Sequence, residues 1–215
     1  MHRVAVLCAL LVAACQPTLS ACCSHPEQRS LMNSLTSRTV KVEVKCLQGG
    51  GSGSGVYLKA HPVWGSVLAT AYHVVDDKDC SFKVDAYSAE VVAHNEEADI
   101  ALLRTYRPWP VNPTRLAGAP YLGMKVIATG YPRQWYNSKT GFQITRGVLA
   151  SFYDKRWRVT SSIWFGSSGG PVFDEEGGLV GLVVSVRVTP LGAPVEDQYY
   201  ITPADKVMEL YDKVY

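Results

Sequence analysis

Residues 161–173, Ser-Ser-Ile-Trp-Phe-Gly-Ser-Ser-Gly-Gly-Pro-Val-Phe, form the most informative segment of the sequence. Apolar residues lie on both sides of a tight turn, Gly166-Ser167-Ser168-Gly169-Gly170-Pro171. Glycine allows backbone conformations that a Cβ atom forbids, so successive N–H groups can point into one small space. A serine hydroxyl beside them can attack a carbonyl while the N–H groups bind the resulting oxyanion. Because the same residues also make ordinary surface turns, this chemistry needs a base and an orienting acid elsewhere in the chain.

The composition favours an all-β protein built as one large domain or two small ones. The chain has 215 residues, which is enough for a substantial core. Val, Tyr, Thr and Gly are plentiful, and long helical periodicity is absent before the C-terminus. The formal net charge is only +2 and there is no basic run, so no nucleic-acid partner is expected.

The N-terminus predicts export. Residues 1–3 carry a positive charge and residues 4–14 are apolar, but this apolar segment is much shorter than the about 20 residues that span a bilayer. Leu-Val-Ala-Ala-Cys at 11–15 resembles the lipobox of bacterial lipoproteins, which implies a signal peptide at 1–14, cleavage before Cys15 and a lipid on its sulfur. The alternative is ordinary cleavage after Ala21, which would discard Cys15. Membrane contact is expected only through the lipid anchor, and the sequence carries no signal for an oligomeric state.

The cysteines agree with an oxidising compartment. Cys8 lies in the signal peptide, and lipidation or loss of Cys15 leaves an even number: Cys22, Cys23, Cys46 and Cys80. Their pairing is open at this point. No Cys-x-x-Cys pair is present, so no zinc site is expected.

Residues 15–38 are polar and aperiodic, and predict a tether from the membrane. Short alternating or apolar segments, typical of β-strands, follow it. In the first half the expected strands are 39–46, 56–58, 67–75, 81–85, 89–93 and 100–103. In the second half they are 124–129, 142–152, 157–162, 171–173, 179–188 and 198–201. A proline-containing connection at 107–119 joins the two halves, and Gly177-Gly178 is a hairpin turn signal.

Two further local patterns bear on the fold. The glycine-rich residues 49–55 run directly into a strand, so we expect another backbone or a substrate to pass close to them. No Gly-Lys-Ser/Thr follows, which argues against a phosphate loop. At the C-terminus, Thr202 is a suitable N-cap and Pro203 a suitable first residue for a helix. One apolar face of that helix is expected to pack on the protein: Val207, Leu210, Tyr211 and Val214.

His73 and Asp99 are the candidates for the base and the acid. His73 closes the apolar segment 67–75, and Asp99 stands directly before an apolar strand. Taken singly, the first fits a satisfied core histidine and the second fits a turn aspartate that caps its own backbone. Taken together with Ser168, they give the chain order His, Asp, Ser across two sets of short strands.

With these residues in place, the sequence resembles the trypsin/chymotrypsin-like serine peptidase family, and within it the short bacterial Deg/HtrA-type peptidases without a PDZ domain. The matching stretches are 70–75, 98–103 and 166–172, supported by Gly53-Ser54-Gly55, Gly130-Tyr131-Pro132 and the final strand and helix. The resemblance covers roughly residues 39–214.

The resemblance implies a peptidase domain at 39–215. It implies two six-stranded antiparallel Greek-key barrels of the chymotrypsin type, roughly at 39–106 and 120–201, followed by a helix at 203–214. Ser168 would be the nucleophile, His73 the general base and then acid, and Asp99 the group that orients the imidazole. The N–H groups of Gly166 and Ser168 would form the oxyanion hole. A protein or peptide substrate is implied, and neither a metal nor a cofactor.

The sequence departs from the family at two places. No Ile-Val-Gly-Gly start follows a processing site, and Ser167 replaces the aspartate that could pair with a new N-terminus. We therefore expect no zymogen activation of the trypsin kind. The family's usual disulfide beside the histidine is absent as well. In the family's barrel the first strand lies antiparallel to the fourth, so Cys46 and Cys80 would adjoin and form a disulfide.

The specificity pocket of the family would have its floor at Ser162 and its walls at Val184, Ser185 and Val186. With no carboxylate at the floor, we expect small or medium apolar residues before the cleaved bond. The alternative to an enzyme is a catalytically silent protease-fold binding protein of the cell envelope. An esterase or another acyl transferase would use the same residues.

Overall fold

The structure is a computed structural model that describes residues 24–63, 65–133, 141–188, 190 and 194–215. The predicted signal peptide at 1–14, the lipidation site Cys15, and Cys22 and Cys23 lie outside the described residues. Among the described helices, none is both long and apolar enough to cross a membrane.

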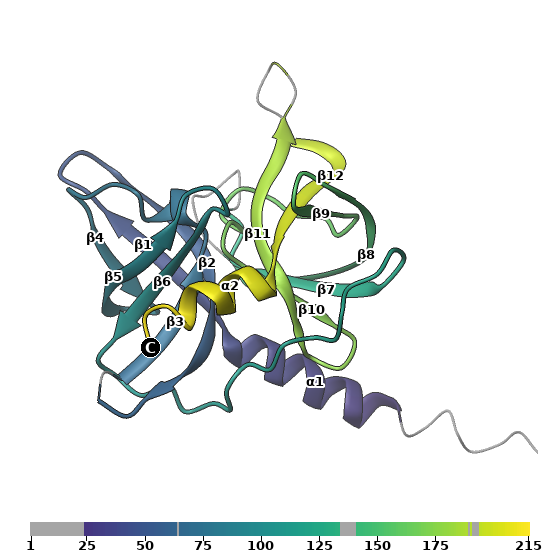
Figure 1. Ribbon diagram of the computed structural model, residues 1–215, viewed down its shortest axis with the longest axis horizontal. Helices are drawn as coiled ribbons and strands as arrows, with labels where there is room; N and C mark the ends of the chain where they lie inside the picture. The colour runs from purple at the N-terminus through teal and green to yellow at the C-terminus, as the bar shows by residue number, and fades with distance from the viewer. Residues whose placement is uncertain (1–23, 64, 134–140, 189, 191–193) are drawn as a thin grey trace, which may run out of the picture.

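Two closed six-stranded antiparallel barrels form the body of the protein, and they lie side by side in Figure 1. The first barrel has the order β1-β2-β3-β6-β5-β4 and contains β1 (Thr39–Lys45), β2 (Gly50–His61), β3 (Gly65–Thr70), β4 (Ser81–Val84), β5 (Tyr87–Asn95) and β6 (Ile100–Thr105). The second has the order β10-β11-β12-β9-β8-β7 and contains β7 (Lys125–Gly130), β8 (Gln143–Tyr153), β9 (Arg156–Val159), β10 (Pro171–Asp174), β11 (Leu179–Val188) and β12 (Pro194–Pro203). Both barrels share one connectivity, and the predicted fold is confirmed.

Local sequence explains several of these elements. Val40 and Val42 of β1 are fully buried and alternate with charged residues, as the period of a strand requires. The turn between β4 and β5 places Asp85 and Ala86 at positive φ, and this geometry matches the twist of a tight hairpin. In β2, a Cβ on Gly55 would lie 2.9 Å from the Ala69 carbonyl oxygen, so the expected close backbone approach is present.

The predicted disulfide between Cys46 and Cys80 is confirmed. β1 and β4 pair antiparallel with Lys45 opposite Ser81, and the two cysteines therefore meet just beyond the end of that ladder. Asp77 lies close to both sulfur atoms. Since the disulfide uses both thiols, this group is not a thiolate site for a metal.

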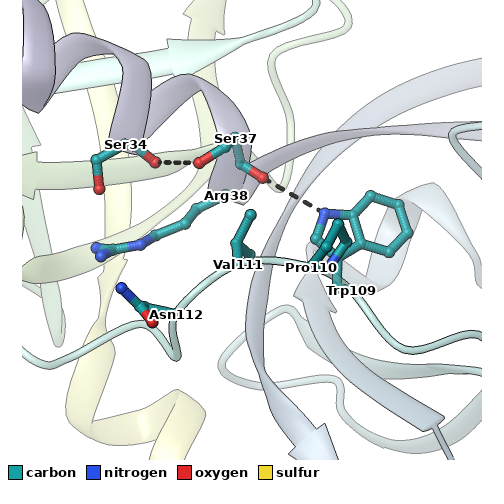
Figure 2. A pocket seen from close by; sticks show the side chains of 7 residues that line it. All are labelled: Ser34, Ser37, Arg38, Trp109, Pro110, Val111 and Asn112. Atoms are coloured by element: carbon teal, nitrogen blue, oxygen red, sulfur yellow. Dashed lines mark hydrogen bonds between the residues drawn. The ribbon is translucent and has the colours of Figure 1, made fainter.

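The structure differs from the expected tether over residues 24–38, which form helix α1 (Ser24–Arg38). Leu35 is fully buried in the apolar cluster between the barrels. Arg38 Nη1 donates to the Gly177 carbonyl (3.2 Å), and Trp109 Nε1 donates to the Ser37 carbonyl (3.4 Å). Figure 2 shows how this end of α1 lies against residues 109–112. A narrow apolar stripe is enough for docking, even though the segment as a whole is polar.

The C-terminal helix is shorter than expected. Helix α2 (Ala204–Tyr211) starts after Pro203, which is the N-cap, and Val214 lies beyond its end. Thr202 was expected to be the cap but belongs to β12, where its hydroxyl donates to the Ala98 carbonyl (2.6 Å). The predicted apolar face is buried at Val207, Leu210 and Tyr211. α2 lies across the junction of the two barrels (Figure 1).

Candidate active site

His73 and Asp99 lie at neighbouring ends of paired strands. β3 and β6 pair with Thr70 opposite Ala101, so the residues after β3 and before β6 are brought together. His73 Nδ1 lies 2.7 Å from Asp99 Oδ2, and the His73 main-chain N–H donates to Asp99 Oδ1 (2.9 Å). The side chain of His73 is 45% exposed and that of Asp99 only 16%. The imidazole can therefore face a substrate while the carboxylate behind it is shielded.

The sequence suggested that His73 ends a strand, and the structure differs on this point. His73 sits in a short 3-10 helix, η2 (Tyr72–Val74), which follows β3. The first N–H of this helix, from Tyr72, donates to the Asp99 carbonyl (3.2 Å). Tyr72 also stacks on His94, with ring centroids 4.4 Å apart.

Asp99 has a left-handed backbone, with φ of +55°. Aspartate tolerates this conformation better than most residues, because its short polar side chain can bond locally. The turn is held by the Asp99 N–H, which donates to the Glu96 carbonyl (3.1 Å). The result is that both carboxylate oxygens and the carbonyl oxygen of Asp99 accept hydrogen bonds from residues 72–73. Nothing in the sequence pattern predicted this conformation.

The Ser168 turn packs against the start of β2 and the end of β3. The Ser54 N–H donates to the Ser168 carbonyl (2.8 Å). Gly169 has φ of +81°, and a Cβ there would lie 2.2 Å from Thr70 Oγ1. A Cβ on Gly53 would lie 2.7 Å from Val74 Cγ1 and 3.1 Å from the Ser168 carbonyl oxygen. Because Gly53 has no side chain, Val74 and the backbone of Ser168 can both pack closely against it.

The structure gives no hydrogen bond between Ser168 Oγ and His73, two residues that it describes fully. Such bonds are often long in the absence of substrate and shorten when it binds.

The N–H groups of the turn divide into two sets. Those of Ser167, Gly169 and Gly170 donate to the carbonyls of Trp164, Val183 and Ser167. Those of Gly166 and Ser168 have no acceptor among the described residues. Main-chain N–H groups are almost always paired in folded proteins. Within the described part of the chain, these two N–H groups are therefore open to an outside acceptor, and the resemblance assigns the oxyanion hole to the same two residues.

Of the four residues expected to form the specificity pocket, the structure describes the side chains of three. Ser162 is exposed and Ser185 is half-buried, whereas Val184 is buried. The side chain of Val186 lies outside the described residues. Ser162 and Ser167 line a small cavity of about 10 Å³ together with Thr129 of β7. Two aromatic residues that the sequence analysis left unassigned, Trp164 and Phe165, are 38% and 41% exposed directly before Gly166.

Tyr131 lies beside the turn, and a Cβ on Gly166 would lie 2.9 Å from its carbonyl oxygen. Its ring packs against Phe142, with centroids 5.4 Å apart, and burial raises the pKa of its phenol. Its neighbour Arg133 donates its N–H to the Phe165 carbonyl (2.7 Å) and so fixes the peptide before Gly166.

A family model of the trypsin-like peptidase domain matches residues 53–182. This chain belongs to the trypsin-like peptidase family. The matched range covers more than half of the chain and contains His73, Asp99 and Ser168. The family predicted from the sequence is confirmed.

Among characterised proteins, this trypsin-like peptidase domain is similar to part of the anti-sigma-I factor RsgI9 of Acetivibrio thermocellus. The two are 30% identical over 151 residues, which is 66% of this chain. The same region is 20% of the relative, so the chain spans about a fifth of that protein's length.

Proposed function

We propose that this protein is a serine endopeptidase that hydrolyses peptide bonds through an acyl-enzyme. The contact of 2.7 Å between His73 Nδ1 and Asp99 Oδ2 carries the proposal. A carboxylate on one ring nitrogen fixes the imidazole with its other nitrogen free to accept a proton. The N–H groups of Gly166 and Ser168, which have no acceptor among the described residues, support the second requirement, a site for the oxyanion.

In the first half of the reaction, Ser168 Oγ forms a bond to the carbonyl carbon while its proton passes to His73 Nε2. The carbonyl oxygen becomes negatively charged and accepts hydrogen bonds from Gly166 and Ser168. The carbon–nitrogen bond then breaks, the proton moves from His73 to the departing amine, and an ester of Ser168 remains.

In the second half, water gives a proton to His73 and its oxygen attacks the ester carbon. The bond to Ser168 Oγ breaks, the proton returns to Ser168, and the acid product leaves. Asp99 stabilises the imidazolium in both halves and remains ionised. All atoms in these steps come from the substrate, one water molecule and the three side chains.

Substrate preference and cellular place belong to the same proposal. We propose small or medium apolar residues before the cleaved bond, because Ser162 brings no charge to the floor of the pocket. Export and a lipid on Cys15 are proposed from the N-terminal sequence alone. Palmitate labelling that is lost in Cys15→Ser supports the lipid, and labelling that persists contradicts it.

A fluorophosphonate probe, which reacts only with activated serines, tests the function on the full-length protein. Labelling is expected for the native chain and for Ser81→Ala, which removes an exposed serine on β4. It should be absent in Ser168→Ala and His73→Ala. A folded native protein that takes no label contradicts the proposal and favours the catalytically silent binding protein. Labelling with turnover of esters but of no peptide favours the esterase alternative.

A further inference from the structure

The turn at residues 166–170 must be held rigidly if its N–H groups are to bind an oxyanion. An aspartate before the nucleophile, paired with an N-terminus, could supply this restraint, but this chain has none there. The residue before the nucleophile is Ser167, which is neutral and buried, and so cannot form an ion pair with an N-terminus. Glycines at 166 and 169, both at positive φ, give the turn conformational freedom. A turn of this kind holds its N–H groups in one direction only if other groups fix its peptide planes.

We infer that the hydroxyl of Ser54 is the positioning group that holds this turn ready to bind an oxyanion, an inference that rests on the proposed function. Ser54 lies on β2 and is completely buried. Its Oγ donates to the Gly166 carbonyl (2.8 Å) and accepts the Tyr131 N–H (2.8 Å). One hydroxyl thereby links the turn to the end of β7.

Each peptide plane of the turn has its own anchor. The N–H of Gly166 belongs to the peptide whose carbonyl, on Phe165, accepts from the Arg133 N–H (2.7 Å). The N–H of Ser168 belongs to the peptide whose carbonyl, on Ser167, accepts from the Gly170 N–H (2.8 Å). Between these two lies the peptide from Gly166 to Ser167. Its N–H donates to the Trp164 carbonyl within the turn (3.0 Å), and Ser54 bonds its carbonyl from another strand. This central peptide sets the orientation of the two flanking peptides relative to each other, and so the direction in which the two N–H groups converge.

Ser54 is itself held firmly, as a positioning group must be. Its N–H donates to the Ser168 carbonyl (2.8 Å), and its own carbonyl accepts from Thr70 Oγ1 (2.7 Å). The surrounding backbone is close: a Cβ on Gly130 would lie 3.0 Å from Ser54 Oγ, and one on Gly170 would lie 3.2 Å from Ser54 Cβ. Both glycines thus make room for the Ser54 side chain, and alanine at this position would fit without the hydrogen bonds.

The chain offers a matched control in Ser66 of β3. Ser66 is also completely buried. Its hydroxyl donates to the Arg107 carbonyl (2.8 Å) and accepts the Trp109 N–H (2.8 Å), which is the bonding pattern of Ser54. Ser66 lies at the other end of β3 from Thr70, opposite Thr105, and takes no part in the site. Ser54→Ala and Ser66→Ala therefore remove the same interaction from two places.

The experiment compares kcat, KM and amide hydrogen exchange in the full-length native protein, Ser54→Ala and Ser66→Ala. Both variants should lose similar thermal stability. In Ser54→Ala alone, kcat on a peptide should fall by about tenfold to a hundredfold with KM nearly unchanged. This is less than the about 10²- to 10³-fold that removal of an oxyanion donor costs, because both donors remain and are only held less firmly. Binding of a peptide aldehyde, which forms an oxyanion on Ser168, should weaken by the same factor. Exchange at residues 164–170 should be faster in Ser54→Ala alone.

Equal kcat and equal exchange in the two variants overturn the inference, and so does a rise in KM with kcat unchanged. Hydrogen exchange keeps the test separate from the proposed function. If the native protein turns over no peptide but Ser54→Ala alone loosens residues 164–170, the positioning role stands and the peptidase proposal fails. If the native protein is active and exchange at these residues is unaltered, Ser54 is an ordinary buried serine.

Discussion

Thr39 and Thr129 join the two barrels directly, with their Oγ1 atoms 2.6 Å apart. Thr39 opens β1, Thr129 lies near the end of β7, and both are buried. Thr39 Oγ1 also bonds to the Leu35 carbonyl (2.8 Å), so one hydroxyl ties α1, the first barrel and the second barrel together. The catalytic candidates come from both barrels, and this contact helps to keep them in register.

We expect Thr39→Val to destabilise the protein by about 1–3 kcal/mol, because it leaves the buried Thr129 hydroxyl without this partner. Thr129→Val should cost less, because the Thr39 hydroxyl keeps its hydrogen bond to the Leu35 carbonyl. The double variant should cost less than the sum, since replacing both partners by apolar groups of one shape leaves neither of them unpaired. Urea unfolding of the four proteins measures the coupling. Strict additivity would show that the contact between the two hydroxyls carries no coupling energy.

Asp99→Asn should lower kcat by about 10⁴-fold with the fold intact, because an asparagine amide on His73 Nδ1 favours the wrong tautomer of the imidazole. Asparagine tolerates the left-handed backbone at this position, so the turn itself should persist. Asp76→Asn, an exposed carboxylate three residues after His73, is the control and should keep full activity. The rate of fluorophosphonate labelling gives the same comparison without a substrate. Equal rates in the two variants would remove Asp99 from the mechanism.

The parts of this structure that the sequence predicts depend on local pattern or on short motifs. Alternation in β1, the glycines of β2 and the three catalytic candidates in chain order are visible in the sequence, and through the family resemblance they led to the barrels. The Cys46–Cys80 disulfide followed from the strand order that the resemblance implied, and it is present.

The parts that could not be predicted depend on distant partners. Residues 24–38 look like a polar tether because the apolar cluster that covers Leu35 comes from both barrels and α2. The role of Ser54 is invisible for the same reason, since its partners Gly166 and Tyr131 lie 112 and 77 residues away. The left-handed backbone of Asp99 depends on its contacts with η2, which the sequence suggested would be the end of a strand.

The integration of α1 gives a direct test of the boundary of the folded domain. Leu35→Ala should destabilise the protein by about 2–5 kcal/mol, because it opens a cavity at the point where both barrels and α2 meet. Asn33→Ala on the exposed face of the same helix should change stability by less than about 0.5 kcal/mol. Urea denaturation of the full-length variants measures both. Equal stability of Leu35→Ala and the native protein would mean that the helix is not docked in solution.

Asp85 predicts a pH dependence of stability that is unrelated to catalysis. Burial raises the pKa of this carboxyl, and this effect outweighs the Lys41 N–H that donates to Oδ1 (2.8 Å). Because the folded pKa exceeds the unfolded value, the folded state binds the proton more tightly. The stability that Asp85 contributes is fully present below the unfolded pKa and is lost as the pH rises through the folded pKa.

Asp85→Asn should therefore be more stable than the native protein at neutral pH and should lose this advantage in acid. The amide oxygen can still accept from Lys41, and asparagine tolerates the positive φ of 44° at this turn. Thermal unfolding of both proteins from acid to neutral pH checks the sign. Asp79→Asn, an exposed aspartate before β4, controls for the change in net charge. If the native protein is more stable than Asp85→Asn at neutral pH, the ionised carboxylate stabilises the fold. Its hydrogen bond from Lys41 would then outweigh the cost of its burial.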